Sequence, residues 1–178
     1  MNDISLVDLI KKGGALLEIT GSTPKEALDC FIQNIRLPAD LPADVLLQAV
    51  LERESLMATS IGGGIAVPHP RNPLLSNESE QFIAIAFLKR PVEWQALDGV
   101  PVQNLILLVS SSARAHLHSL SRVHFLCQEE AFCSLLAKKA SKEEIIKTVG
   151  AIEKEWEEKA ALKEASNSLS LYTPVSEM

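Results

Sequence analysis

The spacing of apolar residues predicts two helices in the first third of the chain. Over residues 24–35, apolar side chains recur every three or four positions and so share one helix face: Ala27, Leu28, Phe31, Ile32 and Ile35. Thr23 and Glu26 flank Pro24 in the pattern of a capping box, so this helix begins at Pro24. Prolines interrupt residues 37–42, and the periodicity predicts a second helix over 43–54.

Two long apolar segments predict buried strands in the middle of the chain. Residues 81–88 and 102–109 are rich in aliphatic side chains and contain few polar ones, as in strands that are covered on both faces. Between them, residues 92–94 suggest a short strand and residues 97–99 a turn.

Helical periodicity returns after the second strand. One helix is predicted to begin near Arg114, because Leu117, Leu120, Val123 and Cys127 have helical spacing. Further helices are predicted over 129–138 and from a capping box at 141–144 to Lys163. Helices on both sides of buried strands predict a three-layer α/β/α domain with a central mixed sheet. Residues 1–163 are expected to form this single domain, and the serine-rich residues 164–178 a flexible tail.

Charge and composition exclude several classes of function. The chain has 17 Lys and Arg against 23 Asp and Glu, a net charge of −6, whereas nucleic-acid binding needs a basic surface. No apolar run is long enough to span a membrane and the N-terminus lacks a secretory signal, so a cytoplasmic protein without membrane insertion is expected. The 3 cysteines have no C-x-x-C spacing, which argues against a disulfide framework.

Residues 61–71 carry the most informative pattern, a glycine run followed by Pro-His-Pro. The flanking prolines restrict the backbone of His69, and a largely neutral imidazole can attack an electrophile. Glycines 62–64 could direct amides at an anion such as a phosphoryl group. The alternative is a rigid turn without chemistry. Neither a Walker A nor a Rossmann pattern follows the glycines, so no nucleotide cofactor is expected.

These residues resemble a known family. The stretches 51–54 and 59–69, the segment 92–102 and the helix start at His116 are similar to the fructose/mannitol-type enzyme IIA of the phosphoenolpyruvate-dependent sugar phosphotransferase system (PTS), including its nitrogen-regulatory branch. The resemblance covers roughly residues 5 to 150. It implies the enzyme IIA fold and a phosphohistidine carrier that works without a cofactor.

The resemblance also implies roles for three residues. His69 would be the phosphoryl acceptor, His116 the second active-site histidine and Arg53 the cation near the phosphate. The implied partners are a phosphocarrier resembling HPr and either an enzyme IIB or a regulatory target. The alternatives are that Arg53 is a solvated residue paired with a neighbouring Glu, and that His116 is a polar residue of a helix cap.

The remaining candidates are interpreted as structural. His118 is expected to be exposed and His124 partly buried, and a zinc site is disfavoured because no ligand spacing fits. Asp98 is read as a turn residue. Three arginines are read as surface residues that an acidic or phosphorylated partner could contact: Arg71, Arg114 and Arg122.

Two positions depart from the family pattern. Pro70 follows the histidine where glycine is common, and Gly63 replaces an asparagine. Pro70 removes a backbone donor and Gly63 a side-chain amide, so phosphate binding could be altered. A second hypothesis is therefore a regulatory binding module with this fold that does not transfer phosphate. The sequence leaves open the sugar or target, the reacting imidazole nitrogen and the oligomeric state.

Overall fold

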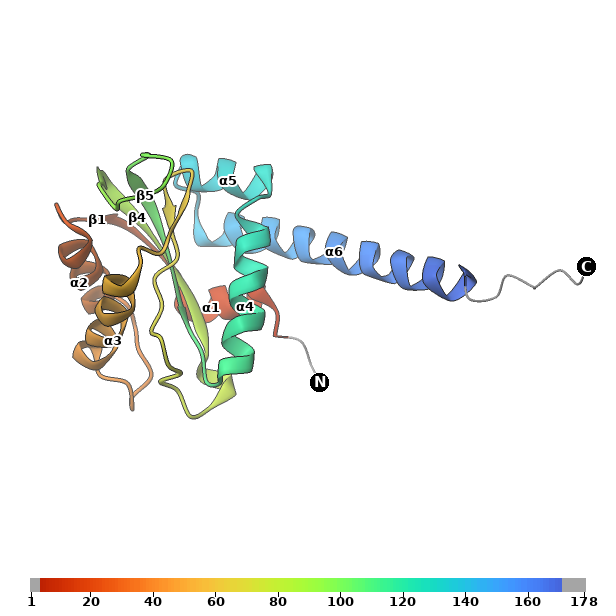
Figure 1. Ribbon diagram of the computed structural model, residues 1–178, viewed down its shortest axis with the longest axis horizontal. Coiled ribbons are helices and arrows are strands. Elements are labelled where there is room, and N and C mark those ends of the chain that lie inside the picture. The colour runs from red at the N-terminus through yellow and green to blue at the C-terminus, as the bar shows by residue number, and fades with distance from the viewer. Residues whose placement is uncertain (1–3, 171–178) are drawn as a thin grey trace, which may run out of the picture.

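A mixed five-stranded sheet forms the centre of the protein, as the computed structural model of residues 4–170 shows (Figure 1). The strand order is β1-β4-β5-β3-β2, with bounds Ala15–Ile19 (β1), Ser60–Gly62 (β2), Ile65–Ala66 (β3), Phe82–Val92 (β4) and Val102–Val109 (β5). β4 pairs antiparallel with β5 and β2 with β3, whereas β1 runs parallel to β4 and β3 runs parallel to β5. The predicted mixed sheet is confirmed.

Helices cover both faces of this sheet (Figure 1). Their bounds are Leu6–Gly13 (α1), Pro24–Asn34 (α2), Ala43–Leu56 (α3), Ala113–Leu126 (α4), Glu130–Ala137 (α5) and Lys142–Ser170 (α6), with a short 3-10 helix at Glu78–Glu80. None of the helices within residues 4–170 is long and apolar enough to cross a membrane.

Alternation along β4 divides the core into two layers. Ala84, Ala86 and Leu88 pack with α2 and α3, whereas Ile83 and Phe87 point the other way, toward α1 and α4–α6. Successive side chains of a strand face opposite sides, so an apolar run can serve two cores at once. The three-layer architecture predicted from the sequence is therefore confirmed.

Several elements differ from the sequence prediction. α1 and β1 were not predicted, because each is short and has too few positions to show a period. The strand expected at 92–94 does not form: Val92 ends β4, after an irregular register that follows Phe87. α6 continues through Ser170, past the predicted end at Lys163. The expected flexibility of 164–178 stays a prediction, and residues 171–178 lie outside the described residues.

One buried carboxylate attaches α6 to the body of the protein. Glu153, 6% exposed, accepts hydrogen bonds from the Ser5 hydroxyl and from the Leu6 and Val7 amides at 2.8, 3.0 and 3.1 Å. It also pairs with Arg122 of α4 at 2.5 Å. A carboxylate at this position satisfies the free amides at the start of α1 and matches the positive end of the helix.

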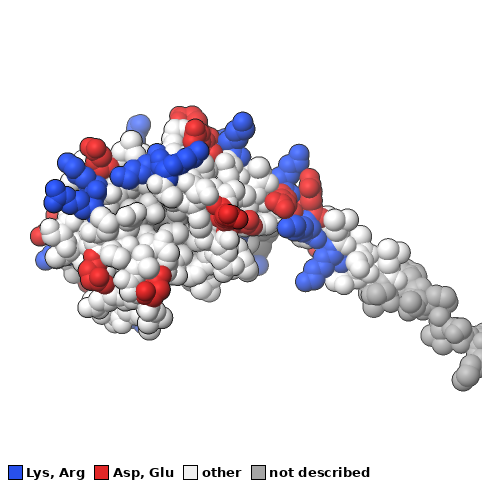
Figure 2. Space-filling view, turned by 90° about the horizontal axis from the view of Figure 1, so that it is seen from above, with Lys and Arg blue, Asp and Glu red and all other residues white. Residues whose placement is uncertain are grey.

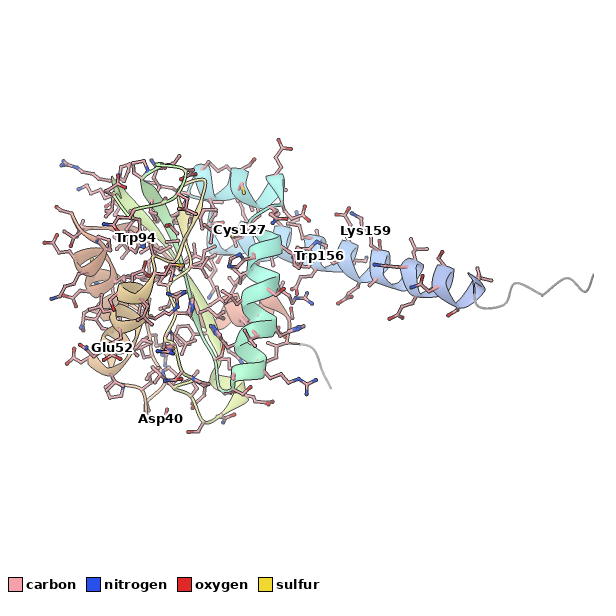
Figure 3. All side chains as sticks on the ribbon, viewed as in Figure 1. Asp40, Glu52, Trp94, Cys127, Trp156 and Lys159 are labelled. Carbon is pink, nitrogen blue, oxygen red and sulfur yellow. The ribbon has the colours of Figure 1, made fainter. Side chains whose placement is uncertain are left out.

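The rest of α6 projects from the body. The Trp156 indole donates to Glu129 at 3.0 Å, and every side chain from 157 to 169 is exposed (Figure 3). Seen from above, acidic and basic side chains gather where α6 leaves the body (Figure 2).

We expect Glu153→Ala to lower the free energy of unfolding by about 3 kcal/mol, because it leaves Arg122 and the α1 amides without their acceptor. Urea denaturation followed by circular dichroism measures the change. Glu155→Ala is the matched control: Glu155 is on the same helix, and its pair with Lys159 is exposed. An effect at Glu153 no larger than that at Glu155 would contradict the anchoring role.

Candidate functional site

His69 is held in a buried, extended segment directly after β3. It is 7% exposed, and its Nδ1 lies 2.8 Å from the Val67 carbonyl oxygen. A carbonyl can only accept, so Nδ1 donates its proton there, and in the neutral ring the lone pair is on Nε2. The nitrogen available for attack is therefore Nε2.

A backbone hydrogen bond connects this segment to β5. The Leu108 amide donates to the Pro68 carbonyl at 3.1 Å, beyond the point where β3 itself ends. β5 ends at Val109 and leads directly into α4, which begins at Ala113. The residue before His69 is thus attached to the strand that leads to the helix of His116.

His116 occupies the first turn of α4. The Ser112 hydroxyl caps the helix by accepting from the Ala115 amide at 3.1 Å, and the His116 amide donates to the Ser112 carbonyl at 3.0 Å. The ring of His116 lies 4.8 Å from that of His69 between centroids, at an interplanar angle of 43°. The two histidines named from the sequence therefore converge on one site.

Arg53 approaches the same site from the last turn of α3. Its Nη1 donates to the Met57 carbonyl at 2.7 Å, so the structure records a backbone bond rather than the ion pair with a neighbouring Glu considered above. Arg53 and His69 share a cavity of about 290 Å³, which we call the His69 cavity. Its other lining residues are Ala58, Thr59, Ser60, Ile61, Val67, Leu120 and His124.

The surroundings keep both imidazoles neutral. Burial lowers the pKa of His69; the Val67 hydrogen bond acts in the opposite direction, and the charge of Arg53 lowers the pKa further. Burial, followed by the nearby His69 and Arg53, lowers the pKa of His116 to about 4. At neutral pH the site therefore holds one permanent cation, Arg53, beside two uncharged rings.

Glu54 is a positioning residue that the sequence did not reveal. One of its oxygens accepts from the Thr59 amide at 2.8 Å and from the Trp94 indole at 2.6 Å, and the other accepts from the Thr59 hydroxyl at 2.6 Å. Trp94 itself is buried on the α3 side of the sheet (Figure 3). Glu54 therefore ties the end of α3, with Arg53, to the segment that enters β2.

The glycine run has a different role from the one expected. Gly62, Gly63 and Gly64 have φ of 92°, 65° and 78°, a left-handed conformation that favours glycine. The Gly63 amide donates to Asp98 at 2.9 Å, and the Val100 amide donates to the same carboxylate at 3.0 Å. These two bonds lower the pKa of Asp98. The anion held by the loop is thus Asp98, and no glycine lines the His69 cavity.

Most of the other candidates lie as predicted, with two corrections. His124 is exposed rather than partly buried, and it borders the His69 cavity. Arg122 is bound to Glu153 and stacks on Trp156, which removes it from the residues that a partner could contact. His118, Arg71 and Arg114 are exposed, as expected. Within residues 4–170 the cysteines are free thiols: Cys30, Cys127 and Cys133.

A family model matches the chain from residue 8 to 151, a range that contains both histidines and Arg53. Its description is phosphoenolpyruvate-dependent sugar phosphotransferase system, EIIA 2. The chain belongs to this EIIA family. The resemblance inferred from the sequence is confirmed, and the part of α6 that projects from the body lies beyond the matched residues.

Two curated relatives represent two branches of the family. This EIIA chain is 30% identical over 128 residues to the nitrogen regulatory protein of Escherichia coli (strain K12), across 70% of this chain and 77% of that protein. It is 32% identical over 147 residues to the fructose-specific EIIABC component of Bacillus subtilis (strain 168), across 80% of this chain and 22% of that protein.

Solved structures share the fold. The nitrogen regulatory protein IIA-Ntr from Neisseria meningitidis superimposes with a TM-score of 0.63 at 23% identity, covering 80% of this chain and 94% of that one. Enzyme IIA-Mtl from Escherichia coli, solved in complex with phosphorylated enzyme IIB-Mtl, superimposes with a TM-score of 0.58 at 16% identity, covering 78% of this chain and 94% of that one. The EIIA fold assigned from the sequence is confirmed.

We expect the two site histidines of this EIIA domain to titrate below the usual value, His116 near pH 4. Between pH 6.5, the ordinary pKa of histidine, and pH 4, the unfolded chain binds protons that the folded chain does not. The free energy of unfolding therefore falls as the pH drops from 6.5 toward 4. Histidine ring NMR measures the midpoints, and urea denaturation at several pH values measures the loss. Equal pH dependence in His116→Gln and the control His118→Gln would contradict this assignment.

Proposed function

We propose that this EIIA domain carries a phosphoryl group on Nε2 of His69. The observation that supports this proposal most strongly is the pair of neutral imidazoles 4.8 Å apart beside Arg53. The phosphoryl group would come from a phosphohistidine carrier resembling HPr. It would pass to an enzyme IIB, or remain on His69 as a signal that a regulatory target reads.

The protonation state of His69 suits an in-line transfer. The Nε2 lone pair forms the new N–P bond while the N–P bond of the donor breaks, and the departing electron pair returns to the donor imidazole. The Nδ1 proton stays on the ring, where the Val67 carbonyl at 2.8 Å stabilises the positive charge that develops. Burial then favours the transfer, because it keeps His69 in the nucleophilic form.

Arg53 and His116 supply the donors for the transferred group. A guanidinium can hold two phosphoryl oxygens at once, and Arg53 lines the His69 cavity. The ring N–H of His116 provides a further donor close to the positive end of α4. Gly63, which departs from the family pattern, does not line the His69 cavity, and this supports phosphate binding there despite the departure.

Exposed apolar side chains around the site suit short-lived partner contacts. Leu56 and Met57 follow Arg53 and are 63% and 72% exposed, and Leu117 follows His116 and is 67% exposed. Partly apolar patches with a charged rim are typical of transient complexes. The solved complex of IIA-Mtl with phosphorylated IIB-Mtl supports an enzyme IIB as one class of partner.

Regulation is one role that the relatives support, because the nitrogen regulatory protein of Escherichia coli is 30% identical to this chain over 128 residues. Sugar transport is the other, because the fructose-specific EIIABC component of Bacillus subtilis is 32% identical over 147 residues. The second candidate, a binding module that transfers no phosphate, depends on Pro70, which leaves no backbone amide directly after the histidine.

We expect the protein to take up acid-labile label from radioactive phosphoenolpyruvate in the presence of enzyme I and an HPr-type carrier, with none in His69→Gln. Phosphorus–nitrogen couplings in NMR should place the group on Nε2, because Nδ1 is bound to Val67. His118→Gln, on the same helix as His116 but outside the His69 cavity, should label like wild type. Label that persists in His69→Gln would overturn the assignment of His69 as the phosphoryl acceptor. Absence of label with every carrier would favour the binding module that transfers no phosphate.

We expect Arg53→Met and His116→Gln each to slow phosphoryl uptake by roughly 10- to 100-fold while His69 remains the site of attachment, since each removes a donor to a charged group. Rapid-quench labelling at fixed carrier concentration measures the rates. Arg71→Met is the matched control, because Arg71 is an exposed arginine close in sequence to His69 and does not line the cavity. Equal rates in Arg53→Met and Arg71→Met would contradict the role of Arg53.

A further inference from the structure

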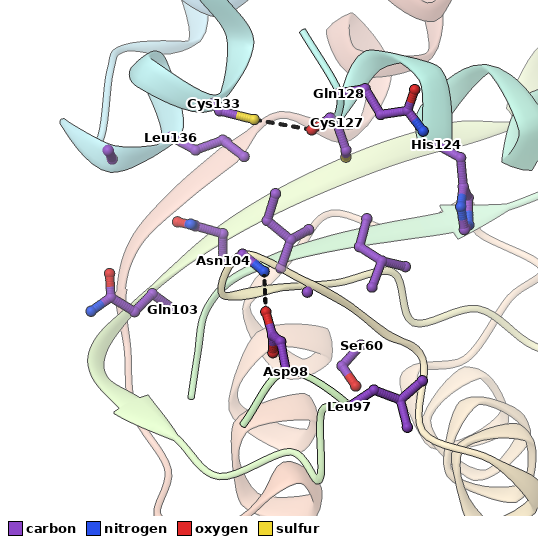
Figure 4. A pocket seen from close by; sticks show the side chains of 15 residues that line it. Ser60, Leu97, Asp98, Gln103, Asn104, His124, Cys127, Gln128, Cys133 and Leu136 are labelled. Atoms are coloured by element: carbon purple, nitrogen blue, oxygen red, sulfur yellow. Dashed lines mark hydrogen bonds between the residues drawn. The ribbon is translucent and has the colours of Figure 1, made fainter. Parts of the chain in front are cut away.

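A second cavity, larger than the His69 cavity, lies next to it along β2 and α4, and we call it the Asn104 cavity. Its volume is about 730 Å³, within the range of small-molecule sites. The glycine loop and Asp98 form one wall, and the end of α4 and α5 form the other (Figure 4). Neither His69 nor His116 lines it.

Asn104 is the unusual residue in this cavity. On β5 it precedes Ile106 and Leu108 in the row of side chains that faces α4 and α5, and it is 8% exposed. Its backbone amide is bound to Gly64, but its side-chain carboxamide has no hydrogen-bond partner among residues 4–170. The carboxamide is not enclosed but accessible from the cavity, because its atoms are not among the fully buried polar atoms without a partner. A polar group that faces a cavity without a protein partner is available to a ligand or to water.

The chemistry of the walls limits the class of ligand. No Lys or Arg lines the cavity, and the Asp98 carboxylate stays ionised because the Gly63 and Val100 amides lower its pKa. Burial raises the pKa of Cys127 to about 12, so that thiol remains neutral. Phosphates and carboxylates would therefore meet a like charge and no cation.

Apolar side chains complete the walls, namely Ile61, Ile65, Leu136 and Ala137. Solvent water can satisfy the carboxamide of Asn104, but it gains nothing from the apolar part of the walls, which a ligand with an apolar body would cover. A carboxamide offers one acceptor and two donors in a plane, which matches a planar edge with the complementary pattern.

We propose that the Asn104 cavity binds a small uncharged organic molecule through a planar donor–acceptor edge, either a carboxamide or a purine, that pairs with the side chain of Asn104. The body of the molecule packs against the apolar wall formed by Ile65 and Leu136. Ser60, Ile61 and His124 line this cavity and the His69 cavity alike, so the bound molecule lies next to the candidate phosphoryl site. The binding itself does not depend on the proposed phosphotransfer.

Calorimetric and NMR titrations of the full chain test this proposal with two uncharged probes, nicotinamide for a carboxamide and adenosine for a purine. At least one should bind and shift the side-chain amide resonances of Asn104 and the amide of Gly63. Nicotinate and adenosine monophosphate, which resemble the probes but are anionic, should bind at least about tenfold more weakly. Absence of binding by both uncharged probes at about 10 mM, or equal binding of the anions, would overturn the proposal.

Asn104→Leu provides the decisive variant. It should weaken the affinity for the bound probe by at least about tenfold without lowering the melting temperature of the ligand-free protein, because it replaces an amide that has no protein partner by an apolar group of similar size. Gln48→Leu, at an exposed position on α3, should leave binding unchanged. Unchanged probe affinity in Asn104→Leu, or a lowered melting temperature, would show that Asn104 has a structural partner and no ligand role.

Discussion

The hydrogen bond from the Leu108 amide to the Pro68 carbonyl is the constraint on which the site depends. β3 is only two residues long, and without this further bond the Pro-His-Pro segment would leave the sheet before it reached α4. Because the bond keeps the segment beside β5, and β5 leads into α4, His69 and His116 meet although 46 residues separate them in the chain. The antiparallel β4–β5 pair, which is buried on both faces, thus forms the rigid support on which His69 and His116 are positioned.

Desolvation and charge act together at this meeting point. The buried ring of His69 and the partly buried ring of His116 resist protonation beside the Arg53 guanidinium, because burial disfavours the charged form and each new positive charge would lie near one that is already present. The same arrangement is suited to an incoming anion, which would find the nucleophilic lone pair of His69, the cation of Arg53 and the neutral N–H of His116 close together. Glu54 keeps that cavity in shape from outside, since it binds Thr59 and Trp94 rather than the histidines.

Two adjacent cavities of opposite character share residues of β2 and α4. Arg53 makes the His69 cavity favourable for anions, and Asp98 makes the Asn104 cavity unfavourable for them. The three glycines with positive φ allow the hairpin to turn tightly enough for the Gly63 amide to reach Asp98. A rearrangement of the β2–β3 hairpin at one cavity would change the shape of the other, because Ser60, Ile61 and His124 line both.

Local patterns in the sequence determined the helices over 24–34 and 43–56, the two central strands and the three site residues named from the family motif. These are features with a strong period, a cap or a distinctive set of neighbours, so neighbouring residues alone carry the information. The glycine run was correctly read as a turn, but its anion was misjudged, because Asp98 lies 35 positions away and only the fold brings it there.

Tertiary structure alone decided the positioning role of Glu54, the lowered pKa values of the two imidazoles, the pairing of Arg122 with Glu153 and the unpaired state of the Asn104 side chain. Each of these depends on burial and on partners distant in sequence, and the free energy of a polar group is set by what surrounds it rather than by its neighbours along the chain. A sequence pattern names the groups that can react; the packing of the sheet against its helices decides which of them meet, and in what charge state.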